Sequence, residues 1–139
     1  YAHTPDGLVN ICNTLNACKA GRLVTVFGCG GDRDRTKRPL MGHTACSNSD
    51  YVFLTNDNPR CEDPRQIFND ILAGMKGFEN YTVVPDRAHA IGAALARAQQ
   101  GDIVIVAGKG HEDYQLIGTE KRHFSDQETV RAFLRSEHV

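Results

Sequence analysis

One short polar segment, Thr55-Asn56-Asp57-Asn58-Pro59-Arg60, directly follows the apolar run 51–54 and brings charged and amide side chains together. Arg60 can hold a carboxylate through two parallel N–H···O bonds, each contributing about 1.5–3 kcal/mol, and Asp57 can accept a hydrogen bond from an ammonium group. Pro59 fixes its own φ and biases Asn58 toward an extended conformation, which presets the loop. The segment therefore suits a zwitterion such as an amino acid. The alternative is an ordinary turn, since Asn, Asp and Pro are common turn formers.

A second polar loop, residues 28–39, combines glycines with the basic side chains of Arg33, Arg35, Lys37 and Arg38. Its backbone N–H groups and these cations could bind an anion or a carboxylate, or the cations could form a solvated surface run. The loop is not a dinucleotide-binding fingerprint, because the third glycine of that motif would have to replace Arg33. The sequence therefore argues against NAD chemistry.

A third loop carries Gly108-Lys109-Gly110-His111-Glu112. Its glycines would let the backbone approach a ligand closely, and Glu112 could receive an ammonium group. The loop is not a phosphate-binding P-loop, because the earlier glycine and the Ser or Thr after the lysine are missing. A histidine such as His111 is more often a hydrogen-bonded loop residue than a base. The chain has no evident catalytic triad, no paired acid and base carboxylates and no His/Cys metal motif, so we assign it no catalytic or metal-binding residue.

The elements that must position these loops alternate along the chain. Strand patterns at 22–27, 51–54, 81–84 and 102–107 alternate with helical patterns, which indicates βαβ units. We predict an α/β fold: a Rossmann-like three-layer domain over residues 1–139, with a mostly parallel sheet and a small C-terminal hairpin over 114–124. The run 102–107 is the most continuously apolar, so we expect it at the centre of the sheet. The loops 28–38, 55–62 and 107–113 should lie along one edge.

Composition narrows the functional class. The chain has 139 residues, 40% of them hydrophobic, and a net charge of −1, which fits one globular domain and argues against a nucleic-acid partner. No apolar run approaches the roughly 18 residues of a membrane helix, and no secretory signal precedes the first helix. The five cysteines are scattered without a CxxC pair, as in reduced cytoplasmic proteins. We therefore expect no membrane partner and a cytoplasmic location.

Several motifs occur in order along nearly the whole chain, and together they resemble the carboxy-terminal domain of the Mur ligases. Within that family they are most similar to the MurE type, which adds meso-diaminopimelate to UDP-N-acetylmuramoyl-L-alanyl-D-glutamate in peptidoglycan precursor synthesis. The motifs are Tyr1-Ala2-His3-Thr4-Pro5-Asp6, Gly28-Cys29-Gly30-Gly31-Asp32-Arg33-Asp34, Lys37-Arg38-Pro39-Leu40-Met41-Gly42, Asp57-Asn58-Pro59-Arg60 and Gly108-Lys109-Gly110-His111-Glu112-Asp113-Tyr114-Gln115.

The resemblance implies the third domain of a three-domain enzyme. Such enzymes use ATP and Mg²⁺ to phosphorylate the D-glutamate carboxylate of the UDP-linked dipeptide, and the amine of the incoming amino acid then attacks the acyl phosphate. The third domain brings in that amino acid and closes over the nucleotide. The upstream substrate-binding and ATPase domains are absent from this sequence, so we expect the isolated domain to be inactive.

The resemblance also implies individual roles. Those for meso-diaminopimelate binding fall on Arg33, Asp57, Asn58, Pro59, Arg60, Gly108 and Glu112, and those for nucleotide binding on His3, Lys37 and Arg38. One alternative is a ligase of the same fold that adds lysine or another amino acid, and Arg60 favours diaminopimelate over it. Another alternative is a non-catalytic amino-acid sensor, which an upstream domain with a phosphate loop would exclude.

Overall fold

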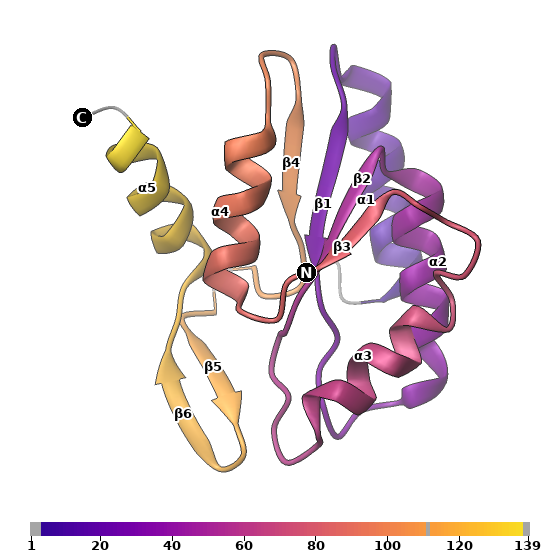
Figure 1. Cartoon of the computed structure of the whole chain (residues 1–139), viewed down its shortest axis with the longest axis vertical. Coiled ribbons are helices and arrows are strands. Elements are labelled where there is room, and N and C mark those ends of the chain that lie inside the picture. Colours follow the sequence, from indigo (N-terminus) through magenta and orange to yellow (C-terminus); the bar gives the residue numbers. More distant parts are fainter. Residues whose placement is uncertain (1–3, 111, 138–139) are drawn as a thin grey trace.

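The computed structural model describes residues 4–110 and 112–137 (Figure 1). Helices and strands alternate as the sequence predicts, and a hairpin and a last helix follow the fourth strand. In chain order the elements are α1 (Pro5–Cys18), β1 (Leu23–Phe27), the short 3-10 turn η1 (Arg35–Lys37), α2 (Arg38–Asn48), β2 (Tyr51–Leu54), α3 (Pro64–Leu72), β3 (Tyr81–Val83), α4 (Arg87–Arg97), β4 (Ile103–Val106), β5 (Tyr114–Ile117), β6 (Glu120–His123) and α5 (Asp126–Glu137).

The main sheet has four parallel strands in the order β3-β2-β1-β4, and β5 and β6 form a separate antiparallel hairpin. This confirms the predicted fold class. The predicted central place of the 102–107 run is wrong, because β4 lies at the edge of the sheet and, within the described part of the chain, pairs with β1 alone. An apolar run reports that helices cover both faces of a strand, and it says nothing about how many strands lie beside it.

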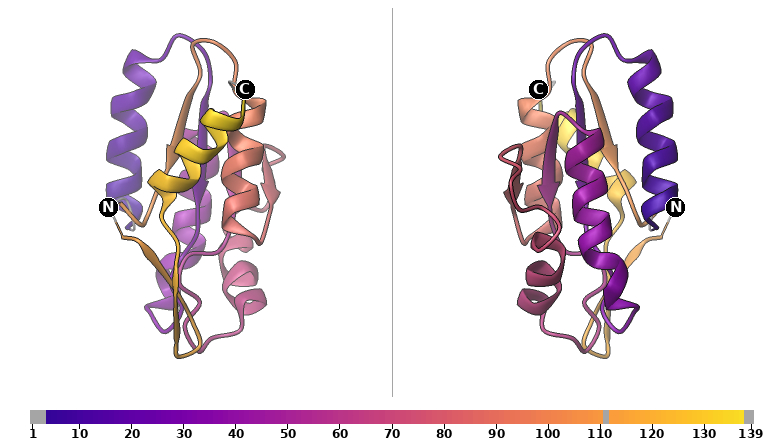
Figure 2. Two further views of the ribbon diagram at one scale, coloured as in Figure 1. Left: turned by 90° about the vertical axis from the view of Figure 1, so that its left-hand side faces the viewer. Right: turned by 90° about the vertical axis from the view of Figure 1, so that its right-hand side faces the viewer.

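Two helical layers cover the sheet. Helices α1, α2 and α3 pack on one face and α4 and α5 on the other (Figure 2). Side chains of β1 alternate between the two cores: Leu23 and Phe27 join the first, and Val24 and Val26 join the second. All five residues of β1 are buried. The strand ends that carry the loops are therefore held by packing on both faces.

Side-chain caps fix where three helices begin. Thr4 accepts a hydrogen bond from the backbone N–H of Gly7 at 3.1 Å, and Asp63 accepts one from Arg65 at 2.9 Å. Asp86 caps α4 in the same way through the N–H of His89 at 2.9 Å. Each cap satisfies an N–H that the helix cannot pair internally. None of the helices within 4–110 and 112–137 is long and apolar enough to cross a membrane.

Candidate functional site

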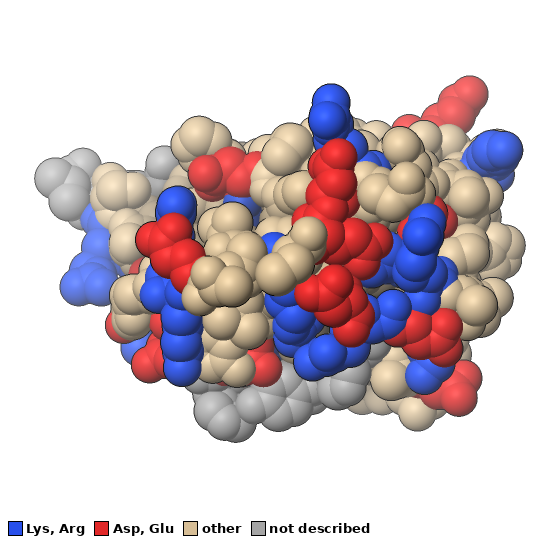
Figure 3. Space-filling model, turned by 90° about the horizontal axis from the view of Figure 1, so that it is seen from below, with Lys and Arg blue, Asp and Glu red and all other residues tan. Residues whose placement is uncertain are grey.

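The loops that follow β1, β2 and β4 enclose a cleft of about 540 Å³ at the carboxyl ends of the strands. That volume lies within the range of about 300–1,000 Å³ typical of small-molecule sites. The chain passes from β1 to β2 on one side, whereas β4 lies on the other side of β1. Parallel α/β sheets bind their ligands at such a point, where the strand order reverses. Seen from this end of the molecule, basic and acidic side chains alternate across the surface (Figure 3).

The cleft collects most of the residues predicted from the sequence. Of the seven predicted diaminopimelate contacts, Pro59 alone is not in the lining and is instead buried beneath it. Lys37 and Arg38 also line the cleft, and His3 lies outside the described residues. The predicted residues that line the cleft are Arg33, Asp57, Asn58, Arg60, Gly108 and Glu112.

The loops that follow β1 and β2 cross with their backbones in contact. The N–H of Gly31 donates to the carbonyl of Asn58 at 2.7 Å, and a Cβ at position 31 would lie 1.8 Å from the Pro59 carbonyl oxygen. Beside the crossing, Asp32 and Arg60 have φ values of 55° and 52°. This left-handed region is unfavourable for side chains other than glycine and persists only where the surroundings enforce it. The crossing therefore fixes the loop after β2 against the loop after β1.

Replacing Gly31 by alanine is expected to destabilise the protein by about 1–3 kcal/mol, the usual cost of forcing an extra methyl group into a packed site. The backbone of Pro59 would have to move, because the added Cβ overlaps its carbonyl. Urea unfolding measures the effect. Gly92→Ala is the matched control. Gly92 lies inside α4, and a Cβ there would meet the Phe133 ring of α5 at an ordinary contact distance of 3.7 Å. This substitution should stabilise the helix by about 1 kcal/mol. Equal unfolding midpoints for the two variants would contradict the crossing.

The Arg60 side chain folds back over the loop that follows β1. Its Nη1 donates to the Gly31 carbonyl at 3.0 Å and lies 3.4 Å from the Asn58 carbonyl. Its backbone N–H donates to the Leu116 carbonyl at 3.0 Å. Among the described residues no acceptor is bonded to its Nε or Nη2, and the side chain is half-buried at the cleft. Those N–H groups can therefore bind a ligand carboxylate, while Nη1 holds the guanidinium in place.

The basic residues of the loop after β1 divide into two groups. Arg33 and Lys37 are exposed at the cleft. Arg35 instead pairs with Asp70 at 2.9 Å, and Arg38 is turned inward.

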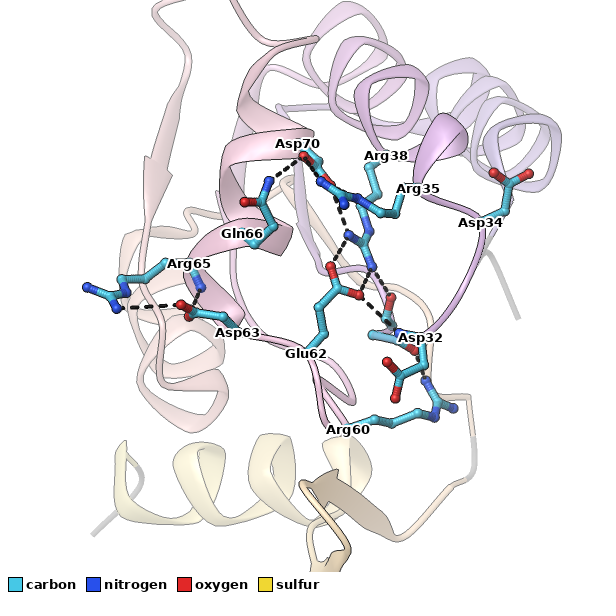
Figure 4. A network of polar contacts seen from close by, with 12 residues as sticks. Asp32, Asp34, Arg35, Arg38, Arg60, Glu62, Asp63, Arg65, Gln66 and Asp70 are labelled. Atoms are coloured by element: carbon cyan, nitrogen blue, oxygen red, sulfur yellow. Dashed lines mark hydrogen bonds and ion pairs between the residues drawn. The ribbon is translucent and has the colours of Figure 1, made fainter.

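Arg38 is buried, and both terminal nitrogens of its guanidinium are bonded to protein oxygens, whereas its buried Nε has no partner among the described residues. Its side chain is 2% exposed and donates to Glu62 at 2.6 and 2.8 Å, to Asp70 at 2.9 Å and to the Gly30 carbonyl at 3.0 Å (Figure 4). This guanidinium joins the loop after β1 to the segment after Arg60 and to α3. Arg38 is therefore a positioning residue, and its terminal nitrogens are already bonded to protein oxygens, which leaves them unsuited to the predicted nucleotide contact.

The two carboxylates of this cluster have strongly lowered pKa values. Hydrogen bonds from Arg38 lower the pKa of Glu62 to about 2, and hydrogen bonds from Arg35, followed by those from Arg38, lower that of Asp70 to about 2. Both pKa values are below those of an unfolded chain, about 4.3 for Glu and 3.9 for Asp. The cluster therefore stabilises the folded state above about pH 4.5, and this contribution is lost as the pH falls toward 2.

We expect the free energy of unfolding to fall steeply between about pH 4.5 and pH 2 and to fall less steeply in Glu62→Gln, which removes one of these titrating groups. Denaturant unfolding at a series of pH values measures both slopes. Glu120→Gln is the matched control, because the Glu120 side chain is 61% exposed and pairs only with Arg122 among the described residues. Parallel curves for wild type and Glu62→Gln would contradict the role of the cluster.

Two buried cations that were not among the predicted site residues hold the loops from inside the protein. The Lys109 side chain is 0% exposed, and its Nζ lies 2.9 Å from Asn58 Oδ1, 3.0 Å from Asp57 Oδ1 and 2.8 Å from the Tyr114 carbonyl. In the sequence, Lys109 stands out only as part of a loop that does not match the P-loop motif. Glycines on both sides were the available signal, because they let the backbone turn the side chain inward.

The second buried cation is Arg87, whose side chain is 0% exposed. It pairs with Asp126 through bonds of 2.7 and 2.8 Å and also donates to the carbonyls of Asn56 and Ala107 at 3.0 and 3.1 Å. It thereby ties the loops after β2 and β4 to the start of α5. Nothing in the sequence marks Arg87 for this role, since its partners are far away along the chain.

The resulting cleft is suited to binding a zwitterion. Arg33, Lys37 and Arg60 offer positive charge, and the carboxylates of Asp57 and Glu112 can accept hydrogen bonds. Cys29 also lines the cleft, but burial raises the pKa of its thiol to about 12, so it stays protonated and is a poor nucleophile. Within 4–110 and 112–137, no group of three His, Cys, Asp or Glu side chains is placed to hold a metal ion.

Comparison with known proteins identifies the family. Residues 1–110 match the family model described as Mur ligase, glutamate ligase domain. The chain belongs to the Mur ligase family. This Mur ligase domain is 57% identical over 134 residues to a protein of Trichormus variabilis and 50% identical over 135 residues to one of Clostridium botulinum, both named UDP-N-acetylmuramoyl-L-alanyl-D-glutamate--2,6-diaminopimelate ligase. It covers 27% and 28% of their lengths, and 96% and 97% of its own residues are matched.

Solved structures agree with this assignment. A structure of a ligase with the same name matches the whole Mur ligase domain with a TM-score of 0.95 and 47% identity, and the domain covers 29% of that chain. A folylpolyglutamate synthase from Thermotoga maritima matches 74% of the domain, which covers 23% of that chain, with a TM-score of 0.52 and 22% identity. The second likeness concerns the fold alone.

Proposed function

We propose that this chain is the amino-acid-binding domain of an ATP-dependent ligase that adds meso-diaminopimelate to UDP-N-acetylmuramoyl-L-alanyl-D-glutamate. One observation carries the proposal: a single cleft places N–H groups of Arg60 that have no acceptor among the described residues near the acidic residues Asp57 and Glu112. The names of relatives that are 50–57% identical over almost all of this chain support it. Because the chain spans only 27–28% of those relatives, the rest of the ligase would lie outside it.

The chemistry of meso-diaminopimelate matches the cleft. Its distal end is a second amino-acid head, so its carboxylate can be held by Arg33 and by the Nε and Nη2 groups of Arg60. Its distal ammonium can be held by Glu112 and Asp57, and the backbone of Gly108 lets the ligand approach closely. Lysine lacks the distal carboxylate and would leave the Arg60 guanidinium unpaired. A site built around a polar group rejects analogues that lack it by about 10⁴–10⁵.

The domain would contribute orientation. With the distal head fixed, the other amine of diaminopimelate is held in one direction, toward the acyl phosphate of the dipeptide. Holding the two reactants in this way replaces a bimolecular encounter with an effectively unimolecular step, which is worth up to about 7–11 kcal/mol of the barrier. If the domain closes over the nucleotide, as its resemblance to the Mur ligases implies, it would also exclude water from the acyl phosphate.

ATP and Mg²⁺ would be bound mainly by the other domains. Bound there, ATP supplies the phosphoryl group that activates the carboxylate. Within this chain, Lys37 is exposed at the cleft and is our candidate for a phosphate contact, together with His3. The five cysteines are free thiols, which supports a cytoplasmic location.

The direct test is an assay of the full-length ligase that contains this chain. ATP-dependent consumption of UDP-N-acetylmuramoyl-L-alanyl-D-glutamate should require meso-diaminopimelate, and L-lysine should replace it with a kcat/KM lower by at least about 100-fold. Equal use of lysine would show that the second carboxylate is not read. Binding of either amino acid without any ATP-dependent product would favour a non-catalytic sensor and overturn the proposal.

A further inference from the structure

The ammonium group of Lys109 is buried beneath the cleft, where it donates two hydrogen bonds and forms one ion pair inside the protein. An ammonium offers three hydrogens, and three oxygens lie within reach: Asn58 Oδ1 at 2.9 Å, Tyr114 O at 2.8 Å and Asp57 Oδ1 at 3.0 Å. The side chain is 0% exposed. Lys109 therefore does not touch a ligand, and any effect on binding must pass through the residues that it holds.

The first of these effects is electrostatic. Asp57 Oδ1 is buried and has no hydrogen-bond partner among the described residues, because its contact with Lys109 lies outside hydrogen-bond geometry and is an ion pair. Buried carboxylates are costly unless a counter-charge is close. With Lys109 in place, the charge of Asp57 is balanced, while its carboxylate at the cleft can still accept a hydrogen bond from a ligand ammonium. Without it, a full negative charge would remain at the floor of a cleft that has to admit a carboxylate.

The second effect is geometric. Asn58 Oδ1 also accepts the backbone N–H of Leu116 at 3.0 Å, so two donors fix this side chain. The carbonyl of the same Asn58 meets the N–H of Gly31 at 2.7 Å and lies 3.4 Å from Arg60 Nη1. A continuous series of contacts therefore leads from Lys109 through Asn58 to the guanidinium of Arg60.

We propose that Lys109 is a positioning residue that makes the cleft selective for an amino acid with a second carboxylate. It neutralises Asp57 and fixes Asn58, and through Asn58 it fixes the orientation of Arg60. The inference rests on the proposed function, since it concerns the amino-acid preference of the same cleft.

The test is Lys109→Met in the full-length ligase, which removes the charge and keeps a side chain of similar length. KM for meso-diaminopimelate should rise by about 10- to 100-fold, as for other misplaced binding groups, while KM for ATP stays within about twofold. The ratio of kcat/KM for diaminopimelate to that for L-lysine should fall by at least about tenfold, because lysine has no distal carboxylate to repel. A uniform change in the kinetics of all substrates would show a merely structural role and overturn the proposal.

A double substitution tests the electrostatic step. In an Asp57→Asn background the Lys109→Met change should cost less than it does in the wild type, because the amide needs no counter-charge. Equal costs in both backgrounds would exclude Asp57 as the link. If Lys109→Met does not fold, Lys109→Gln carries the same prediction, since it removes the charge and keeps a donor.

Lys19→Met is the matched control. Lys19 pairs with Asp50 at 2.6 Å at the opposite end of the sheet, so this variant should keep wild-type kinetics for every substrate. The outcomes separate the two proposals. A wild-type ligase that does not use meso-diaminopimelate would overturn the proposed function, whereas a wild-type ligase that does, with an unchanged preference in Lys109→Met, would overturn the role of Lys109 alone.

Discussion

Replacing Arg60 by alanine is expected to lower kcat/KM for meso-diaminopimelate by about 30- to 4,000-fold in the full-length ligase. Truncating one partner of a hydrogen-bonded charge pair costs about 2–5 kcal/mol, and each 1.4 kcal/mol is a factor of ten. The loss should fall mainly on this substrate, because lysine makes no carboxylate contact with Arg60. The selectivity for diaminopimelate over lysine should therefore fall by nearly the same factor. Steady-state kinetics with both amino acids measure it.

Two further variants sharpen this test. Arg60→Lys keeps the positive charge and loses the planar fork, so it should recover only part of the activity. Arg65→Ala is the matched control, because the Arg65 side chain is 88% exposed and bonds only to Asp63 among the described residues. Kinetics in Arg65→Ala should be unchanged within about twofold, as expected for a surface residue. An unchanged preference in Arg60→Ala would reject Arg60 as the residue that reads the distal carboxylate.

Replacing Arg87 by methionine is expected to destabilise the protein by about 3–5 kcal/mol, because it leaves Asp126 buried without its partner. The Asp126 side chain is 6% exposed, so water cannot replace the lost bonds. The carbonyls of Asn56 and Ala107 also lose a donor. A loss of this size lowers Tm by about 10–20 °C in a domain of this length. Calorimetry or circular dichroism measures it.

The control is Arg22→Met. Arg22 pairs with Asp102 at 3.5 Å, and its side chain is 45% exposed, so the change should cost no more than about 1 kcal/mol. The double variant Arg87→Met with Asp126→Leu should be more stable than Arg87→Met alone, because an apolar pair removes the stranded charge. If Arg87→Met were no less stable than Arg22→Met, the buried pair would not be a main support of the loops.

Most of the cleft could be predicted from the sequence, because its residues adjoin strand ends and the strands are clearly patterned. Once the order of strands and helices is known, the loops after 27, 54 and 106 must share one edge. Motifs in those loops then identify the cleft. The place of β4 could not be predicted in this way, since burial of both faces is common to central and edge strands.

The supporting ion pairs could not be predicted, because each joins residues that are distant in sequence. Arg38 meets Glu62 and Asp70, and Arg87 meets Asp126. A lone arginine is usually exposed, and no local pattern marks the few that are buried.

Helix α4 shows a related difficulty. The helical period fits an inward stripe of Ala88, Ile91, Leu95 and Ala98, but the buried residues are Arg87, Ala90, Ile91 and Ala94. Alanine recurs so often in this helix that two neighbouring stripes fit the helical period equally well. The inward turn of Arg87 decides between them.

The crossing of the loops at Gly31 and Pro59 has a consequence for evolution. Because a side chain at position 31 would overlap the Pro59 carbonyl, a mutation of Gly31 is neutral only if the loop that carries Pro59 has already shifted. Drift at the two sites should therefore be epistatic, so that the loops change together or not at all in descendants of this gene. A lineage that acquires a new amino-acid preference would be expected to exchange both loops as one inherited block.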